Sequence, residues 1–216
     1  MKILLKLLLL VGFISSFQIN KETNLINLQI DGFTDSVELI VPKEFKLPST
    51  DLEKEEAQFL LEGLNQTSNA NYQYVLMDSW QEIDGSTILV STLGSLRNLQ
   101  GNITESYWNE MKQALSGYSQ SELKALAEEY RNTHNVHPFS GDHEYSIGNL
   151  VFTSNSITVF GDNFFEIHGE VKELVTATKM IYYQGFIINV LVWVDKELQE
   201  SHEKIKNYSS LIDFKK

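Results

Sequence analysis

The stretch Phe186-Ile187-Ile188-Asn189-Val190-Leu191-Val192-Trp193-Val194 decides the fold of this 216-residue chain. Successive side chains of a β-strand point to opposite faces of a sheet, and in this stretch both faces are apolar. One face carries Ile188, Val190, Val192 and Val194, and the other carries Ile187, Leu191 and Trp193. A strand that is apolar on both faces is typical of a sheet that is covered on both sides. We therefore expect a central strand here.

A partner strand precedes this stretch directly. Residues 174–183 have the pattern of a strand, and Gln184-Gly185 predicts the turn between the two. A second hairpin is predicted around Asp84-Gly85, a dipeptide that tolerates the positive φ angles of tight turns. Further short strands are predicted at residues 25–30, 37–41, 74–82, 87–93, 150–152, 157–160 and 164–168.

Helices are predicted where capping residues precede apolar residues at helical spacing. The caps are Thr50 with Glu53 for a helix over residues 51–64, Thr104 for a second helix, and Ser119 with Glu122 for a third. A last helix follows Asp195. The apolar positions expected on these helices are Leu52, Phe59, Leu60 and Leu64, then Tyr107, Trp108, Met111, Ala114 and Leu115, then Leu123, Leu126, Ala127 and Tyr130, and finally Leu198, Ile205, Tyr208 and Ile212.

The order of these elements, hairpins with helices inserted between them, predicts the fold class. We expect an α+β protein with a mainly antiparallel sheet flanked by helices, an α/β/α sandwich. The chain has no internal repeat, no low-complexity tract and no linker rich in proline, glycine and serine. Residues 17–216 are therefore expected to form a single domain.

Residues 1–16 have the pattern of a secretory signal peptide. Lys2 gives a positive start, residues 3–14 form an apolar run interrupted only by Lys6 and Gly12, and two serines follow. The run is shorter than the roughly 20 residues that span a bilayer. We therefore expect no stable membrane anchor, and a periplasmic or secreted protein.

The charge of the chain excludes some partners. With 29 acidic and 17 basic side chains, its formal charge is −12 at neutral pH. Such a surface repels the phosphates of nucleic acids and the anionic head groups of lipids, so no nucleic-acid partner is expected. A protein partner, if there is one, is expected to present a basic surface, and its association rate should then fall with salt.

The absence of cysteine excludes several chemistries outright. An exported protein meets an oxidising compartment, yet this one forms no disulfide and must rely on its packed core. A cysteine nucleophile, a thiolate metal site and a lipid-modified cysteine are excluded as well.

The ordering of the elements resembles the Mog1/PsbP-like group of α/β/α sandwiches. Residues 37–42 followed by residues 43–45 match the opening strand and proline-containing phrase of that group. Residues 174–194 match its two long paired strands, and residues 197–214 match its terminal helix with a hydrophobic ending. The resemblance implies an accessory, binding or assembly factor, and it carries over no catalytic residue, because the group shares an architecture rather than an active site.

Three of the five histidines lie within ten positions of one another, where a predicted helix ends in a loop. His134, His137 and His143, with Glu144 as an alternative to the third, are candidate ligands of an open metal site, since imidazole and carboxylate bind zinc. Their spacing matches no standard metal signature. Histidines at the end of a helix also interact favourably with its dipole without any metal.

Patterns of catalytic residues are otherwise missing from the sequence. Ser121-Glu122-Leu123-Lys124 and Ser201-His202-Glu203-Lys204 match the Ser-x-x-Lys nucleophile pattern, but its companion motifs are absent. There is no nucleophile elbow and no glycine loop for phosphates or dinucleotides. A glycosidase pair of carboxylates remains open, because its members need only meet in space.

These observations favour a binding protein over an enzyme. We expect an exported, non-enzymatic domain without a cofactor that binds a protein partner or a small ligand in the cell envelope. The alternatives are a metal-dependent hydrolase that uses His134, His137 and His143, and a carrier that holds an apolar ligand between its sheet and its helices.

Overall fold

The computed structural model describes residues 22–67, 70–80, 85–93, 99–119, 121–125, 146–167 and 170–215. Its regular elements are β1 (Thr23–Leu28), β2 (Val37–Pro42), α2 (Asp51–Thr67), β3 (Ala70–Met77), β4 (Thr87–Leu93), α3 (Glu105–Ser116), β5 (Ser146–Phe152), β6 (Ser156–Ile167), β7 (Glu170–Tyr183), β8 (Phe186–Asp195), α5 (Ser201–Leu211) and β9 (Asp213–Phe214). The α+β class predicted from the sequence is confirmed.

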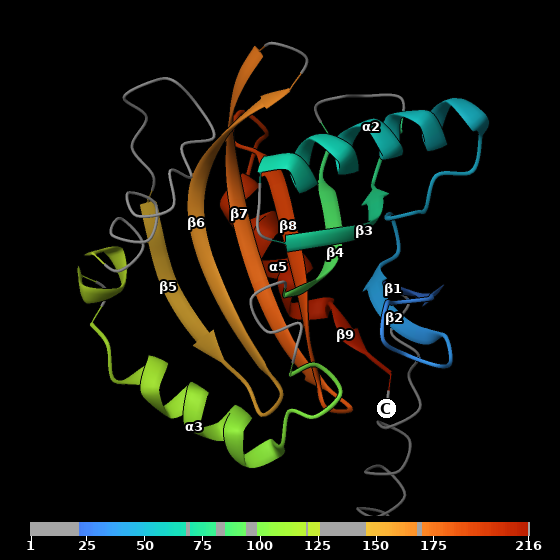
Figure 1. Cartoon of the computed structure of the whole chain (residues 1–216). Coiled ribbons are helices and arrows are strands. Elements are labelled where there is room, and N and C mark those ends of the chain that lie inside the picture. The colour runs from blue at the N-terminus through green and yellow to red at the C-terminus, as the bar shows by residue number, and fades with distance from the viewer. Residues whose placement is uncertain are drawn as a thin grey trace, which may run out of the picture.

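A six-stranded antiparallel sheet forms the centre of the molecule (Figure 1), with strand order β3-β4-β8-β7-β6-β5. The predicted central strand is β8, which pairs with β4 on one side and β7 on the other. All ten of its residues are buried, as its sequence predicts for a strand that is apolar on both faces.

Helices cover the sheet on both faces. In Figure 1, α2 crosses in front of the sheet and α5 lies behind it. Leu191 and Trp193 of β8 pack with Ala57 and Leu64 of α2. Towards the other end of the same face, Ile187 packs with Trp108 of α3. The antiparallel sheet flanked by helices is therefore present as predicted.

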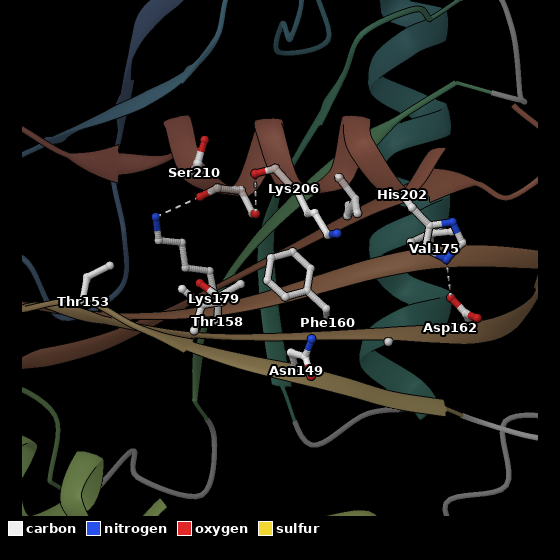
Figure 2. Close-up of a pocket in the computed structure, with 14 residues that line it drawn as sticks. Asn149, Thr153, Thr158, Phe160, Asp162, Val175, Lys179, His202, Lys206 and Ser210 are labelled. Atoms are coloured by element: carbon white, nitrogen blue, oxygen red, sulfur yellow. Dashed lines mark hydrogen bonds and ion pairs between the residues drawn. The ribbon is translucent and has the colours of Figure 1, made fainter. Parts of the chain in front are cut away.

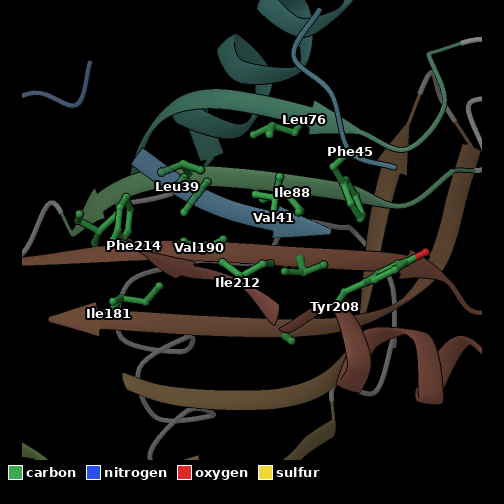
Figure 3. Close-up of a cluster of buried hydrophobic side chains, with 14 of the residues drawn as sticks. Leu39, Val41, Phe45, Leu76, Ile88, Ile181, Val190, Tyr208, Ile212 and Phe214 are labelled. Carbon is green, nitrogen blue, oxygen red and sulfur yellow. The ribbon is translucent and has the colours of Figure 1, made fainter. Parts of the chain in front are cut away.

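The main hydrophobic core lies on the opposite face, between the sheet, α5 and the N-terminal strands (Figure 3). Val190 and its even-numbered neighbours on β8 meet Ile205, Tyr208 and Ile212 at α5. The ring of Tyr208 stands edge-on to that of Phe45, with their centroids 5.0 Å apart. This core fixes the position of α5 over the sheet.

A second, three-stranded sheet of order β1-β2-β9 completes this layer. Leu39 of β2 is opposite Phe214 of β9, and both are buried in the main core. The Tyr74 hydroxyl of β3 joins the two sheets, because it donates to Gln29 O and accepts from Gln29 N, each at 2.8 Å. The sequence did not predict β9, whose two residues were assigned to the end of the last helix.

Side-chain caps occur where the sequence predicts them. Glu53 N–H donates to Thr50 Oγ1, while the Glu53 carboxylate accepts from Thr50 N–H, and hydrogen bonds from Thr50 and then Ser49 lower the pKa of Glu53. The same reciprocal bonds join Ser119 and Glu122. These predicted helix starts are confirmed.

Several strand predictions are wrong in their extent: β1, β5 and β7 begin two to four residues before their predicted starts, and two other differences have a visible cause. The first strand of the β3–β4 hairpin was expected to reach residue 82, but β3 ends at Met77. Beyond this point the Asp78 carboxylate accepts from the N–H of Ser86, the residue before β4, at 2.8 Å, so this N–H bonds to a side chain rather than to a strand carbonyl. The predicted strands at 157–160 and 164–168 are one strand, β6, because Gly161 pairs with Thr176 of β7 and continues the ladder.

Several predicted core positions on helices are exposed. Leu52 and Phe59 of α2 are 66% and 67% exposed, and Tyr107 of α3 is 42% exposed. Each lies outside the part of its helix that touches the sheet. Leu198 precedes α5 rather than lying on it, since its N–H closes a turn onto Asp195 O at 3.1 Å. Leu126, Ala127 and Tyr130 lie outside the described residues.

The β7–β8 turn forms at Gln184 and Gly185, as predicted, with φ angles of 50° and 82°. A Cβ atom on Gly185 would lie 2.9 Å from Gly101 O. Gly101 N–H and Ile103 N–H both donate to Gly185 O, at 2.9 and 3.2 Å, so the turn also anchors the segment before α3.

Gly185→Ala is expected to lower the free energy of unfolding by about 2 kcal/mol or more, because it adds strain at positive φ and a contact with backbone. Gly63→Ala is the control. Gly63 lies exposed in α2 with nothing within 4 Å of an added Cβ, so this change should stabilise by about 0.5–1 kcal/mol. Urea unfolding of both variants measures the two effects, and equal effects would contradict this account of the turn.

Candidate functional site

The metal ligands predicted from the sequence, His134, His137 and His143, lie outside the described residues, as does the leader at residues 1–16. Within the part of the chain that the structure describes, no group of three or more histidines, cysteines or carboxylates could hold a metal ion. Among the described helices, none is both long and apolar enough to cross a membrane. The metal hypothesis therefore stays a prediction.

A groove between α5 and the strands β5, β6 and β7 is the candidate site (Figure 2). Its volume is about 560 Å³, within the range of small-molecule sites. The residues that line it are Asn149 and Val151 of β5, Thr153 directly after β5, Thr158, Phe160, Gly161 and Asp162 of β6, Val175 and Lys179 of β7, and His202, Ile205, Lys206, Ser209 and Ser210 of α5.

The groove exists because the sheet extends beyond the helix that covers it. On this face α5 contacts β7, β8 and β2. The sheet continues past β7 to β6 and β5, and alternate residues of these strands face the same side as α5. The helix and the two outer strands therefore form the walls of a hollow.

The middle of the groove is apolar. Phe160 lies on its floor in Figure 2, between Lys179 and Val175. Val175 and Ile205 are buried beside it, whereas Val151 on the edge strand is 48% exposed. An aromatic ring with aliphatic neighbours offers apolar surface to the body of a ligand.

Lys179 closes one end of the groove. It is 6% exposed, and its ammonium donates to Ser209 O at 2.9 Å and to Ile212 O at 2.5 Å. These carbonyls lie at the C-terminus of α5, where a helix leaves acceptors without partners. Burial lowers the pKa of Lys179, and the nearby charge of Asp213 opposes that shift. Lys179 therefore holds α5 against the sheet.

Asp162 marks the other end of the groove. Its carboxylate accepts from Lys196 Nζ at 3.3 Å and lies 3.6 Å from His202 Nε2. Lys196 also donates to Glu173, and this bond, with that to Asp162, raises the pKa of Lys196 despite some desolvation. The Asp162 carboxylate is therefore paired with a lysine that it shares with Glu173.

Polar groups on the rim face the groove between these two ends. Lys206 of α5 and Asn149 of β5 are exposed, and Figure 2 draws them on opposite sides of the Phe160 ring. Among the described residues, no carboxylate pairs with the Lys206 ammonium. An ammonium and an amide on facing walls can both donate hydrogen bonds to a ligand.

Among the described residues that line the groove, no hydroxyl is bonded to a base. Ser209 Oγ donates to Lys206 O and Ser210 Oγ to Asn207 O, so both hydroxyls bond to their own helix. His202 lies beside Asp162 at the far end, and Ser201, the first residue of its Ser-x-x-Lys motif, donates to Lys196 O. What the described groove offers is binding through apolar contact and hydrogen bonds.

This site was not predicted from the sequence, where Ile205 is a core position and His202 belongs to an incomplete Ser-x-x-Lys motif. The signal was the spacing of residues 202, 205, 206 and 209, which places polar and apolar side chains on one face of the last helix. The strands that form the opposite wall cannot be assigned to that face without the register of the sheet.

Comparisons with known proteins leave the family of the chain open. No family model matches it, and no curated protein does. The solved structure of LpqN, a protein involved in cell envelope biogenesis of Mycobacterium tuberculosis, is similar with a TM-score of 0.35 and 15% identity, over 94% of this chain and 97% of that chain. At this TM-score the similarity supports no statement about fold or function. The resemblance to the Mog1/PsbP-like group stays a prediction.

Lys179→Met is expected to lower the free energy of unfolding by about 1–3 kcal/mol, because two carbonyls at the end of α5 lose their donor. Lys204→Met, on the same helix but outside the groove, should change it by less than about 0.5 kcal/mol. Urea unfolding measures both. Equal effects of the two substitutions would contradict the role of Lys179.

The pH dependence of stability gives an independent check on Lys179. Its pKa is lowered in the folded chain and returns to 10.5 on unfolding. Between these two values the unfolded chain binds more protons, so this residue makes the free energy of unfolding rise with pH. The difference between the wild type and Lys179→Met should therefore widen from neutral pH towards 10.5. A difference that stays constant or narrows would contradict the buried position of the ammonium.

Proposed function

We propose that this protein is an exported, non-enzymatic domain that binds a small molecule in the groove between α5 and the strands β5, β6 and β7. The observation that carries the proposal is the groove itself, with a volume of about 560 Å³ and a mixed lining of apolar and polar side chains. Small-molecule sites are typically concave and mostly apolar, with a few polar groups that orient the ligand.

The elements that form the groove are held firmly in place, which favours the binding of a small molecule. Its floor belongs to the same sheet as the fully buried strand β8, and its helical wall is tied down by Lys179. A preformed site loses little conformational entropy when a ligand binds. The hollow therefore suits a small molecule better than it suits the broad, flatter surface of a protein partner.

The proposal of export depends on the sequence of residues 1–16 and on the missing cysteines. A periplasmic or secreted domain without disulfides needs a core that is stable by itself, and the core between β8 and α5 provides one. Binding without catalysis agrees with the hydroxyl groups of α5, which are bonded to helix carbonyls rather than to a base.

Asn149→Trp tests the proposal, because an indole at this position would fill the groove beside Phe160. The probe is N-phenylnaphthylamine, an uncharged aromatic molecule whose fluorescence rises on apolar surfaces. We expect the wild type to bind it and Asn149→Trp to bind it at least about tenfold more weakly, a loss of about 1.4 kcal/mol.

Asn207→Trp is the matched control. It makes the same change on an exposed residue of α5 that does not line the groove, so binding should stay at the wild-type level. The proposal fails if the wild type does not bind the probe, or if both tryptophan variants bind it as the wild type does.

A further inference from the structure

We infer that the ligand of this groove is an amphiphile with an anionic head group, held with its charge at Lys206 and its apolar body along Phe160. The inference rests on the proposed function and names the class of molecule that the site takes. It is carried by the distribution of charge around the groove, by the ammonium of Lys206, which has no carboxylate partner in the part of the chain that the structure describes, and by the separation of polar and apolar surface along the walls.

The charge of the groove is opposite to that of the protein. The chain carries a formal charge of −12. Of the described residues that line the groove, two are lysines, Lys179 and Lys206, one is the histidine His202, and one is the carboxylate Asp162. A local concentration of cations on an acidic protein attracts anions to this place and away from the rest of the surface.

The single carboxylate of the lining does not cancel this charge. Asp162 bonds to Lys196, which lies outside the groove lining, and Lys196 is in turn shared with Glu173. His202 lies 3.6 Å from the same carboxylate. Asp162 is therefore paired with groups at its own end of the groove, and no ion pair joins it to Lys206.

Lys206 lines the groove on an exposed part of α5. Its ammonium has no carboxylate partner among the described residues, whereas the ammonium of Lys179 is taken up by the carbonyls of Ser209 and Ile212. The amide of Asn149 faces the groove from the other wall. A carboxylate, sulfonate or phosphate between these walls would accept from a charged and a neutral donor.

The apolar part of the groove indicates that the body of the ligand, apart from its head group, is apolar. Phe160 of β6, Val151 of β5 and Ile205 of α5 are apolar residues of the lining, and Val151 is half-exposed on the edge strand. A simple anion would leave this surface in water, and a simple hydrocarbon would leave Lys206 without a partner. An amphiphile satisfies both parts of the groove at once.

Two probes with the same aromatic body separate these possibilities. Anilinonaphthalene sulfonate carries one sulfonate that N-phenylnaphthylamine lacks. We expect the wild type to bind the sulfonate about tenfold more tightly than the uncharged probe at low salt, and this preference should shrink as salt screens the charge. Equal affinities for the two probes would overturn the inference and leave the proposed function standing.

Two substitutions, Lys206→Gln and Lys204→Gln, test whether Lys206 causes the preference for the sulfonate over the uncharged probe. Both remove one positive charge from α5, but only Lys206 lines the groove. Lys206→Gln should bring the affinity for the sulfonate close to that for the uncharged probe, whereas Lys204→Gln should keep most of the preference. A loss of the same size in both variants would mean that the helix attracts anions in general, and the inference would be wrong.

Discussion

The structure depends on the burial of β8 on both of its faces. A strand that buries ten consecutive residues needs a layer of structure on each side of the sheet. On one side α2 and α3 provide that layer, and on the other α5 and the small sheet β1-β2-β9 provide it. Burial of a large aliphatic side chain is worth about 1.5–3 kcal/mol, so this strand carries a large share of the folding energy.

The same constraint produces the groove. Because α5 must cover β7 and β8, it is too narrow to cover β6 and β5 as well, and these outer strands extend past it. The C-terminus of α5 is held by the buried ammonium of Lys179, so the helix stays beside the hollow. Lys206 of α5 and Phe160 of β6 therefore line the same groove, and the core fixes the position of both elements.

The central hairpin, the helix caps and the fold class could all be predicted from the sequence, because each depends on residues close together in the chain. The turn at Gln184-Gly185 needs positive φ, and Thr50 and Ser119 are followed three residues later by glutamate. The strand lengths of β3 and β6 could not be predicted. They depend on partners elsewhere in the chain, such as Ser86 for Asp78 and Thr176 for Gly161.

The candidate site could be predicted only in part. The sequence places His202, Ile205 and Lys206 on one helical face, but it does not say that Phe160 and Asn149 lie opposite them. That arrangement requires the order of six strands and the registers that join β5, β6 and β7. The members of the histidine cluster are neighbours in sequence, whereas the groove combines β5 and α5, whose lining residues are more than fifty positions apart along the chain.

The central claim is that the groove binds a small molecule, and a backbone amide NMR titration with decanoate, an amphiphile with a carboxylate head, tests it most directly. The account predicts that the shifts concentrate on the residues of β5, β6, β7 and α5 that line the groove, with those near Phe160 and Lys206 moving most. Shifts that concentrate on α2 and α3, which cover the other face of the sheet, would contradict it. So would a spectrum that decanoate leaves unchanged.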